Sequence, residues 1–131
     1  MRVDRRELGA ILAGGFLGAL LRAIIGDALP THPGDWPWST FTVNLLGATL
    51  LGYATTRLQE RLPHTAYRRP FIGTGLCGGL TTFSTMQLEI IGMIDAHRLG
   101  LALAYATASV TAGTLVLALA SNLVRRARLI R

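Results

Sequence analysis

The residue types best suited to chemistry gather in one uncharged stretch, GTGLCGGLTTFSTM, residues 73–86. No charged residue occurs from Pro70 to Leu88, and these 19 residues are long enough to cross a bilayer as a helix. The centre of the stretch nevertheless combines glycines with threonine and serine, which loosen helices or compete for their backbone hydrogen bonds. We therefore predict a helix that breaks near residues 75–82, with a first half over about 71–76 and a second half starting near Thr82 or Phe83.

A break of this kind has chemical consequences within a membrane. Non-helical backbone at membrane depth is tolerated only where protein buries it or water reaches it. The break frees carbonyl groups that can bind a cation, and it creates a helix N-terminus whose amides favour an anion. Past the break, Phe83 and Met86 are expected on one helical face, with Thr82, Thr85 and Glu89 on the neighbouring face. An unbroken packing helix kinked by its glycines is the alternative.

Four hydrophobic windows organise the chain, at residues 8–25, 36–56, 70–88 and 99–124. Half of the residues are hydrophobic and 15% are charged, and the windows lack the polar face of a soluble helix. We predict an all-α membrane protein in which residues 1–131 form one domain. Its four transmembrane helices are expected at about 7–28, 38–59, 71–94 (broken near 75–82) and 99–124.

Polar side chains inside these windows are candidates for function. Arg22 ends a row of small residues at steps of four; it either reaches the membrane interface or anchors an anion or a carbonyl network. Asn44 needs a partner in hydrocarbon, which is either an interhelical hydrogen bond or a role as a pore-lining donor. Tyr105 and Ser109 form a polar stripe on the last helix, although such hydroxyls can also bond to their own backbone.

The charge distribution predicts the orientation of the chain. All 13 basic residues are arginine, and 11 of them fall on one side of a four-pass protein. These are Arg2, Arg5, Arg6, Arg57, Arg61, Arg68, Arg69, Arg125, Arg126, Arg128 and Arg131. The positive-inside rule then places both termini in the cytoplasm of a cell-membrane protein. Anionic lipid is a sufficient partner for this charge, so nucleic acid is not needed to explain it.

Enzymatic chemistry lacks a basis in this sequence. It has no paired carboxylates in mid-membrane, no histidine and cysteine ligand set, no nucleophile beside a base and no phosphate-binding loop. The single cysteine, Cys77, excludes an internal disulfide. We therefore expect a transport or assembly role.

Three motifs resemble those of the Fluc/CrcB fluoride channels. They are GGFLGALLR (14–22), STFTVNLLG (39–47) and GLCGGLTTFSTM (75–86), and the likeness covers essentially the whole chain. The resemblance implies a fluoride-selective channel that exports cytoplasmic fluoride passively and gives fluoride resistance. It also implies an antiparallel, inverted dimer of four-helix subunits with two pores.

The resemblance further assigns roles to individual residues. A central structural Na⁺ at the dimer interface would be held by backbone carbonyls matching Gly78 and Thr81. Arg22 matches the arginine at the end of the first helix, and Glu89 matches an acidic position beyond the aromatic site. The fluoride path would be lined by Asn44, Phe83, Met86, Tyr105 and Ser109, with Thr82, Ser84 and Thr85 as nearby candidates. Met86 departs from the family, which usually has phenylalanine there, so its role is open.

The arginine bias also bears on the partner subunit. A chain with 11 arginines against one or two should insert in a single orientation. An antiparallel dimer would then need a homologous subunit of opposite orientation, so a heterodimer is favoured over a dual-topology homodimer. The alternative functions are an exporter like the small multidrug-resistance proteins, or a non-conducting partner subunit of a heterodimeric channel.

Overall fold

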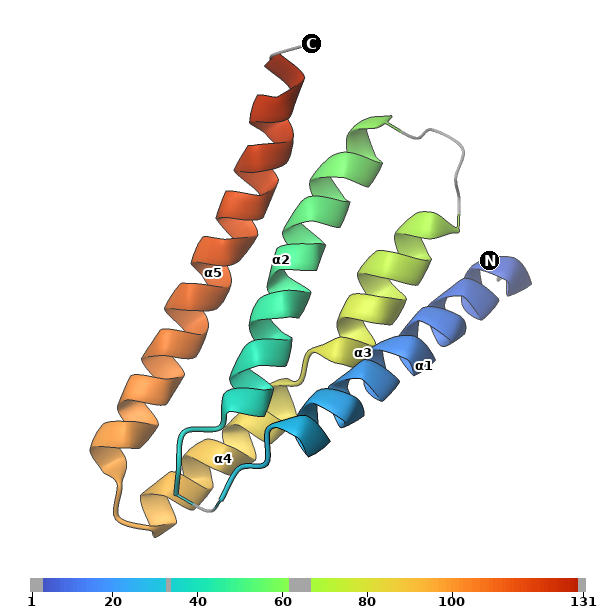
Figure 1. The fold of residues 1–131 in the computed structure, drawn as a ribbon. Coiled ribbons are helices and arrows are strands. Elements are labelled where there is room, and N and C mark those ends of the chain that lie inside the picture. Colours follow the sequence, from blue (N-terminus) through green and yellow to red (C-terminus); the bar gives the residue numbers. More distant parts are fainter. Residues whose placement is uncertain (1–3, 33, 62–66, 130–131) are drawn as a thin grey trace.

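The computed structural model describes residues 4–32, 34–61 and 67–129, and this part of the chain contains helices and no strand (Figure 1). Its elements are α1 (Arg5–Ala28), α2 (Trp38–Arg61), the π-helix η1 (Pro70–Cys77), α3 (Gly78–Leu80), α4 (Phe83–Asp95) and α5 (Leu99–Leu129). Arg2 and Arg131, which enter the charge count, lie outside the described residues.

The arginine-rich segments share one end of the bundle. Figure 1 shows the N- and C-terminal ends, the end of α2 and the start of η1 toward the same end, with α4 at the other end. The connections from α1 to α2 and from α4 to α5 also lie at the α4 end. The charge asymmetry of the sequence is therefore an asymmetry of the folded chain.

Glycines let α1 approach the segment formed by η1 and α3. A methyl group at Gly14 would collide with the carbonyl of Phe71, and one at Gly79 would collide with the carbonyl of Gly15. Gly18 and Gly75 are equally tight, each against backbone of the opposite helix. Small residues that bring two backbones together are the usual way in which membrane helices pack, because lipid gives no hydrophobic drive for helix association.

A second close crossing joins α2 to α5. Gly52 of α2 lies directly against the backbone of Leu117, and the Ser121 hydroxyl donates to the Gly52 carbonyl at 3.2 Å. Buried side chains on the same two helices include Val43, Ala54 and Ala120. The two helix pairs, α1 with η1 and α2 with α5, are the scaffold on which the remaining elements are placed.

The glycine-rich stretch differs from the prediction in where its helix ends. We expected the first half to end near residue 76, but the helical backbone continues to Leu80. Thr81 and Thr82 are extended, with φ −78°, ψ 154° and φ −147°, ψ 115°, and α4 begins at Phe83. Gly75 and Gly79 stay helical because their role is close contact with α1, and the two threonines provide the non-helical step.

The helices expose much apolar surface. By length and composition, Arg5–Ala28 and Leu99–Ala127 are able to cross a membrane, and only 11% of the residues in each apolar window are buried. Helix α2 has the same 24-residue length as α1 but carries several threonines and an asparagine. Apolar helices that are exposed along their length fit a membrane better than the core of a soluble protein.

The glycine contacts predict a position-specific effect on stability. Gly79→Ala should lower the free energy of unfolding by roughly 1–3 kcal/mol, because the new methyl group overpacks a backbone contact that cannot move aside. The measurement is thermal or denaturant unfolding of the purified protein in detergent.

Gly73→Ala is the matched control, since a methyl group there meets nothing within 4 Å. It should be neutral or slightly stabilising, because alanine favours a helix more than glycine does. Equal stability of the two variants would show that the crossing of α1 with α3 tolerates a wider separation than the structure has.

Candidate functional site

The extended step at Thr81 and Thr82 is fastened to α2 by one side chain. The Asn44 amide donates to the Thr82 carbonyl at 3.1 Å, and the Thr82 amide donates to Asn44 Oδ1 at 2.8 Å. One asparagine thus satisfies both backbone groups of a residue that has left the helix. The sequence allowed Asn44 either an interhelical hydrogen bond or a role as a pore-lining donor, and the structure shows the hydrogen bonds that link α2 to the start of α4.

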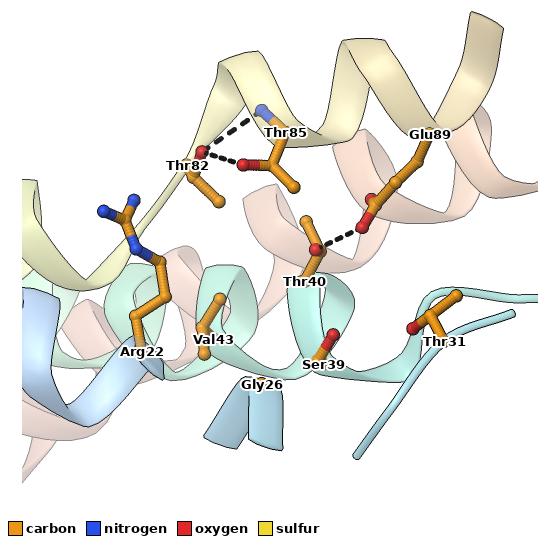
Figure 2. Close-up of a pocket in the computed structure, with 9 residues that line it drawn as sticks. All are labelled: Arg22, Gly26, Thr31, Ser39, Thr40, Val43, Thr82, Thr85 and Glu89. Carbon is orange, nitrogen blue, oxygen red and sulfur yellow. Dashed lines mark hydrogen bonds between the residues drawn. The ribbon is translucent and has the colours of Figure 1, made fainter. Parts of the chain in front are cut away.

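Thr82 also caps the helix that follows it. Its hydroxyl accepts from the Thr85 amide at 3.2 Å and donates to Thr85 Oγ1 at 2.9 Å (Figure 2). Ser84 Oγ lies 3.4 Å from the same hydroxyl. A threonine at this position satisfies one of the amides that a helix start leaves free. The positive end of the α4 dipole therefore lies at a cluster of three hydroxyl groups.

Arg22, in the C-terminal half of α1, reaches the same step. Its Nη1 donates to the Thr81 carbonyl at 3.4 Å, a long hydrogen bond across 59 residues of sequence. The sequence left open whether Arg22 reaches the membrane interface, anchors an anion or anchors a carbonyl network. The hydrogen bond to the Thr81 carbonyl agrees with the last of these. The guanidinium adds positive charge beside the start of α4.

Carbonyl groups become available where the helix stops. The Thr82 amide, which would bond to Gly78 in a continued helix, donates to Asn44 instead. Gly78 lies exposed on the surface of the described chain, and a methyl group added there would meet nothing within 4 Å. Carbonyl oxygens of this kind are the ligands that hard cations prefer.

A cavity of about 230 Å³ adjoins the step. Figure 2 shows Arg22 and Glu89 toward opposite ends of this cavity, with Thr82 and Thr85 between them. A second cavity, of about 310 Å³, shares Thr31, Thr85 and Glu89 with the first. Five hydroxyl groups line the first cavity, together with one cationic and one anionic side chain. The nine residues around the first cavity are Arg22, Gly26, Thr31, Ser39, Thr40, Val43, Thr82, Thr85 and Glu89.

Glu89 holds two hydroxyl groups from other helices. The Thr40 hydroxyl donates to Oε1 at 2.6 Å, and the Tyr105 hydroxyl donates to Oε2 at 2.8 Å. Both carboxylate oxygens are therefore satisfied where α2, α4 and α5 meet. The sequence drew attention to Glu89 and Tyr105 but missed Thr40 as their partner, although Thr40 lies one turn before Asn44 on the same face of α2.

Phe83 and Met86 differ in how far their side chains are buried. Phe83 is 72% exposed, whereas Met86 is 6% exposed and packs with Met93, Ala102 and Tyr105. Residues three apart lie on neighbouring positions of one helix face, so the difference lies in what covers each side chain. The core packs against Met86, whereas the described chain leaves Phe83, the first residue of α4, uncovered.

The remaining candidates lie around this centre. Ser84 and Thr85 are exposed, while Tyr105 is fully buried in the core. Ser109 is one turn beyond Tyr105 on α5, and its buried hydroxyl has no hydrogen-bond partner within the described part of the chain. The structure brings together the residues of α2, α4 and α5 that the sequence marked, and it leaves Phe83 projecting outward.

Comparisons with known proteins agree on one family. Residues 9–121 match the family described as CrcB-like protein, Camphor Resistance (CrcB). A Mycobacterium bovis protein named Fluoride-specific ion channel FluC 1 is 59% identical over 128 residues, which is 98% of this chain and 97% of that protein. A Nocardia farcinica protein named Fluoride-specific ion channel FluC 2 is 43% identical over 90% of this chain and 81% of its own length. A Streptomyces coelicolor FluC 1 protein is 35% identical over 95% of this chain and 81% of its own length. The chain therefore belongs to the CrcB family.

Proposed function

We propose that this membrane protein is a fluoride-specific ion channel that lets cytoplasmic fluoride leave the cell passively and so gives fluoride resistance. The observation that carries the proposal is the 59% identity, over nearly the whole chain, to a relative named as a fluoride-specific ion channel. The chain is a channel subunit and not an enzyme.

The chemistry of the site suits a small, strongly hydrated anion. Such an ion needs hydrogen-bond donors to replace its water, and it must still be released. The cavity beside the threonine step offers hydroxyl groups, the start of α4 and one guanidinium, which itself donates to a carbonyl. A cluster of unpaired cations would bind the anion too firmly for passage. Hydroxyl donors bind it weakly enough to let it go.

We assign the fluoride path to the face that joins α2, α4 and α5. Asn44 keeps one amide hydrogen beyond the one that bonds to Thr82, so it is able both to hold the step and to donate to an ion. Met86 shapes the wall from within the core rather than facing the ion directly. The path residues are those expected from the sequence, namely Asn44, Phe83, Met86, Thr82, Ser84, Thr85, Tyr105 and Ser109, with Arg22 and Glu89 beside them.

The functional unit is proposed to be an antiparallel dimer with two pores, each chain crossing the membrane four times with its third helix broken in mid-membrane. The exposed ring of Phe83 supports this arrangement, because a large aromatic side chain beside a polar site is available to enter a partner subunit. The edge of an aromatic ring carries partial positive charge and is able to face an anion.

The dimer also accounts for the Na⁺ that the family resemblance implies. The residues fit such an ion in part: the Gly78 carbonyl has lost its helical donor to Asn44, and the Thr81 carbonyl retains a lone pair beside its long bond to Arg22. Two carbonyls from one chain are too few for a hard cation, so a second subunit would supply the others. When bound, Na⁺ would add fixed positive charge at the break.

We further propose that both termini face the cytoplasm and that the partner is a homologous chain of opposite orientation. The support is the arginine bias, 11 residues on one side, together with the fold that brings these segments to one end. A dual-topology homodimer is the alternative arrangement.

The proposed path predicts loss of fluoride flux in two variants. Phe83→Ile removes an aromatic edge, and Asn44→Asp replaces a donor by an anion, so each should slow fluoride efflux from liposomes by about tenfold or more. The measurement is release of fluoride detected with a fluoride electrode, using the chain together with its partner if it needs one.

Phe16→Ile and Asn122→Asp are the matched controls, because Phe16 is 74% exposed on α1 and Asn122 is exposed on α5. Both should conduct as the original protein does. If Phe83→Ile and Asn44→Asp also leave the flux unchanged, the proposed path is wrong.

The proposed orientation predicts a single topology when the chain is expressed alone. Tags on the two termini should both be found on the cytoplasmic side, and liposomes that hold the chain alone should release little fluoride. Adding a homologous subunit of opposite charge bias should restore the flux. Finding both orientations, together with a working channel, would refute the heterodimer and leave the dual-topology homodimer.

A further inference from the structure

A third cavity lies away from the proposed ion path, between α2 and α5. Its volume is about 480 Å³, larger than either cavity at the site. Its walls are mostly aliphatic, and the polar groups among its lining residues belong to Thr49, Tyr53 and Arg57. Leu46 and Leu123 line it while remaining largely exposed, so the described chain leaves this groove open to its surroundings.

The groove runs along the helices for about the depth of one lipid leaflet. On α2 its wall is formed by Leu46, Leu50, Tyr53 and Arg57, a spacing of four, three and four that keeps one helical face. Arg57 follows Leu46 by eleven positions, which is roughly 16 Å along a helix. Half of the hydrocarbon core of a bilayer is about 15 Å.

Positive charge marks one end of the groove only. Arg57 lies at the end toward the C-terminus of α2, where the arginine-rich segments of the chain gather. Arg125 and Arg126 are exposed on α5 next to the lining residues Val124 and Ala127, but they do not line the groove themselves. A guanidinium group matches the oxygens of a phosphate, and arginines at this depth attract the headgroups of anionic lipids.

We propose that this groove binds one anionic phospholipid, with an acyl chain between α2 and α5 and the phosphate at Arg57. The apolar wall accounts for the acyl chain, the length accounts for a single leaflet, and the arginines select a negatively charged headgroup over a zwitterionic one. Tyr53 lies one turn below Arg57, at a level where an aromatic residue with a hydroxyl group suits the boundary of headgroup and hydrocarbon.

The test is native mass spectrometry of the purified full chain, with phosphatidylglycerol and phosphatidylcholine offered in equal amounts. The original protein should retain phosphatidylglycerol in preference. Arg57→Gln should lower its retention about five-fold, which corresponds to the loss of one arginine near an anionic headgroup. Ala127→Trp, which fills an exposed part of the groove, should lower the retention of both lipids.

Arg68→Gln is the matched control, because Arg68 is an exposed arginine at the same end of the molecule but outside the groove. It should retain phosphatidylglycerol as the original protein does. The proposed site would be wrong if Arg57→Gln retained as much phosphatidylglycerol as the original protein. It would also be wrong if Arg57→Gln and Arg68→Gln lost phosphatidylglycerol to the same extent. So would a disulfide between two copies carrying Leu123→Cys and Cys77→Ser, since a second copy would then occupy the groove. None of these measurements depends on fluoride flux.

Discussion

The paired hydrogen bonds between Asn44 and the backbone of Thr82 are the interaction on which the site depends. Thr82 is buried, and a residue that leaves a helix in a buried position loses the helical partners of its amide and carbonyl, which is costly unless other groups replace them. The Asn44 side chain forms hydrogen bonds with both the amide and the carbonyl of Thr82. These two bonds fix the direction in which α4 leaves the step. The cap formed by Thr82, the approach of Arg22 and the meeting of Glu89 with Thr40 all follow from that direction. A side chain with only a donor would leave the Thr82 amide without a partner, and one with only an acceptor would leave the Thr82 carbonyl without one.

Close helix contacts hold this step in register. The glycines of α1 meet those of η1 and α3, so the helix that ends at Leu80 is held at backbone distance from α1. Gly47 plays a similar part on α2, where a methyl group would collide with the Thr81 side chain. The extended residues thus lie between two surfaces that have no room to shift. Weak interactions with an ion need such rigidity, because a mobile donor would lose the geometry that makes it selective.

Much of this arrangement could be read from the sequence, because its signals are local. Hydrophobic windows predicted the helical segments, and a cluster of glycine and threonine predicted unwinding in the third. The end of the first half was misplaced because a helical glycine used for packing and a glycine that ends a helix look alike in sequence. The hydrogen bonds from Thr40 and Tyr105 to Glu89 could not be predicted from the sequence, because they depend on the angle at which α4 leaves the step. The burial of Met86 and the exposure of Phe83 depend on the same angle.

The π-helical form of η1 constrains how this protein can vary in length. A π-helix bonds each amide five residues back, so Pro70–Cys77 holds more residues per turn than an α-helix does. Deleting one residue there would return the backbone to ordinary α geometry, because the wide turns hold a residue that an α-helix of the same winding does not. The helix beyond the deletion would keep nearly the same orientation, and Thr82 would still face Asn44. The same deletion within α1 would instead turn the rest of that helix and move its glycines away from η1 and α3.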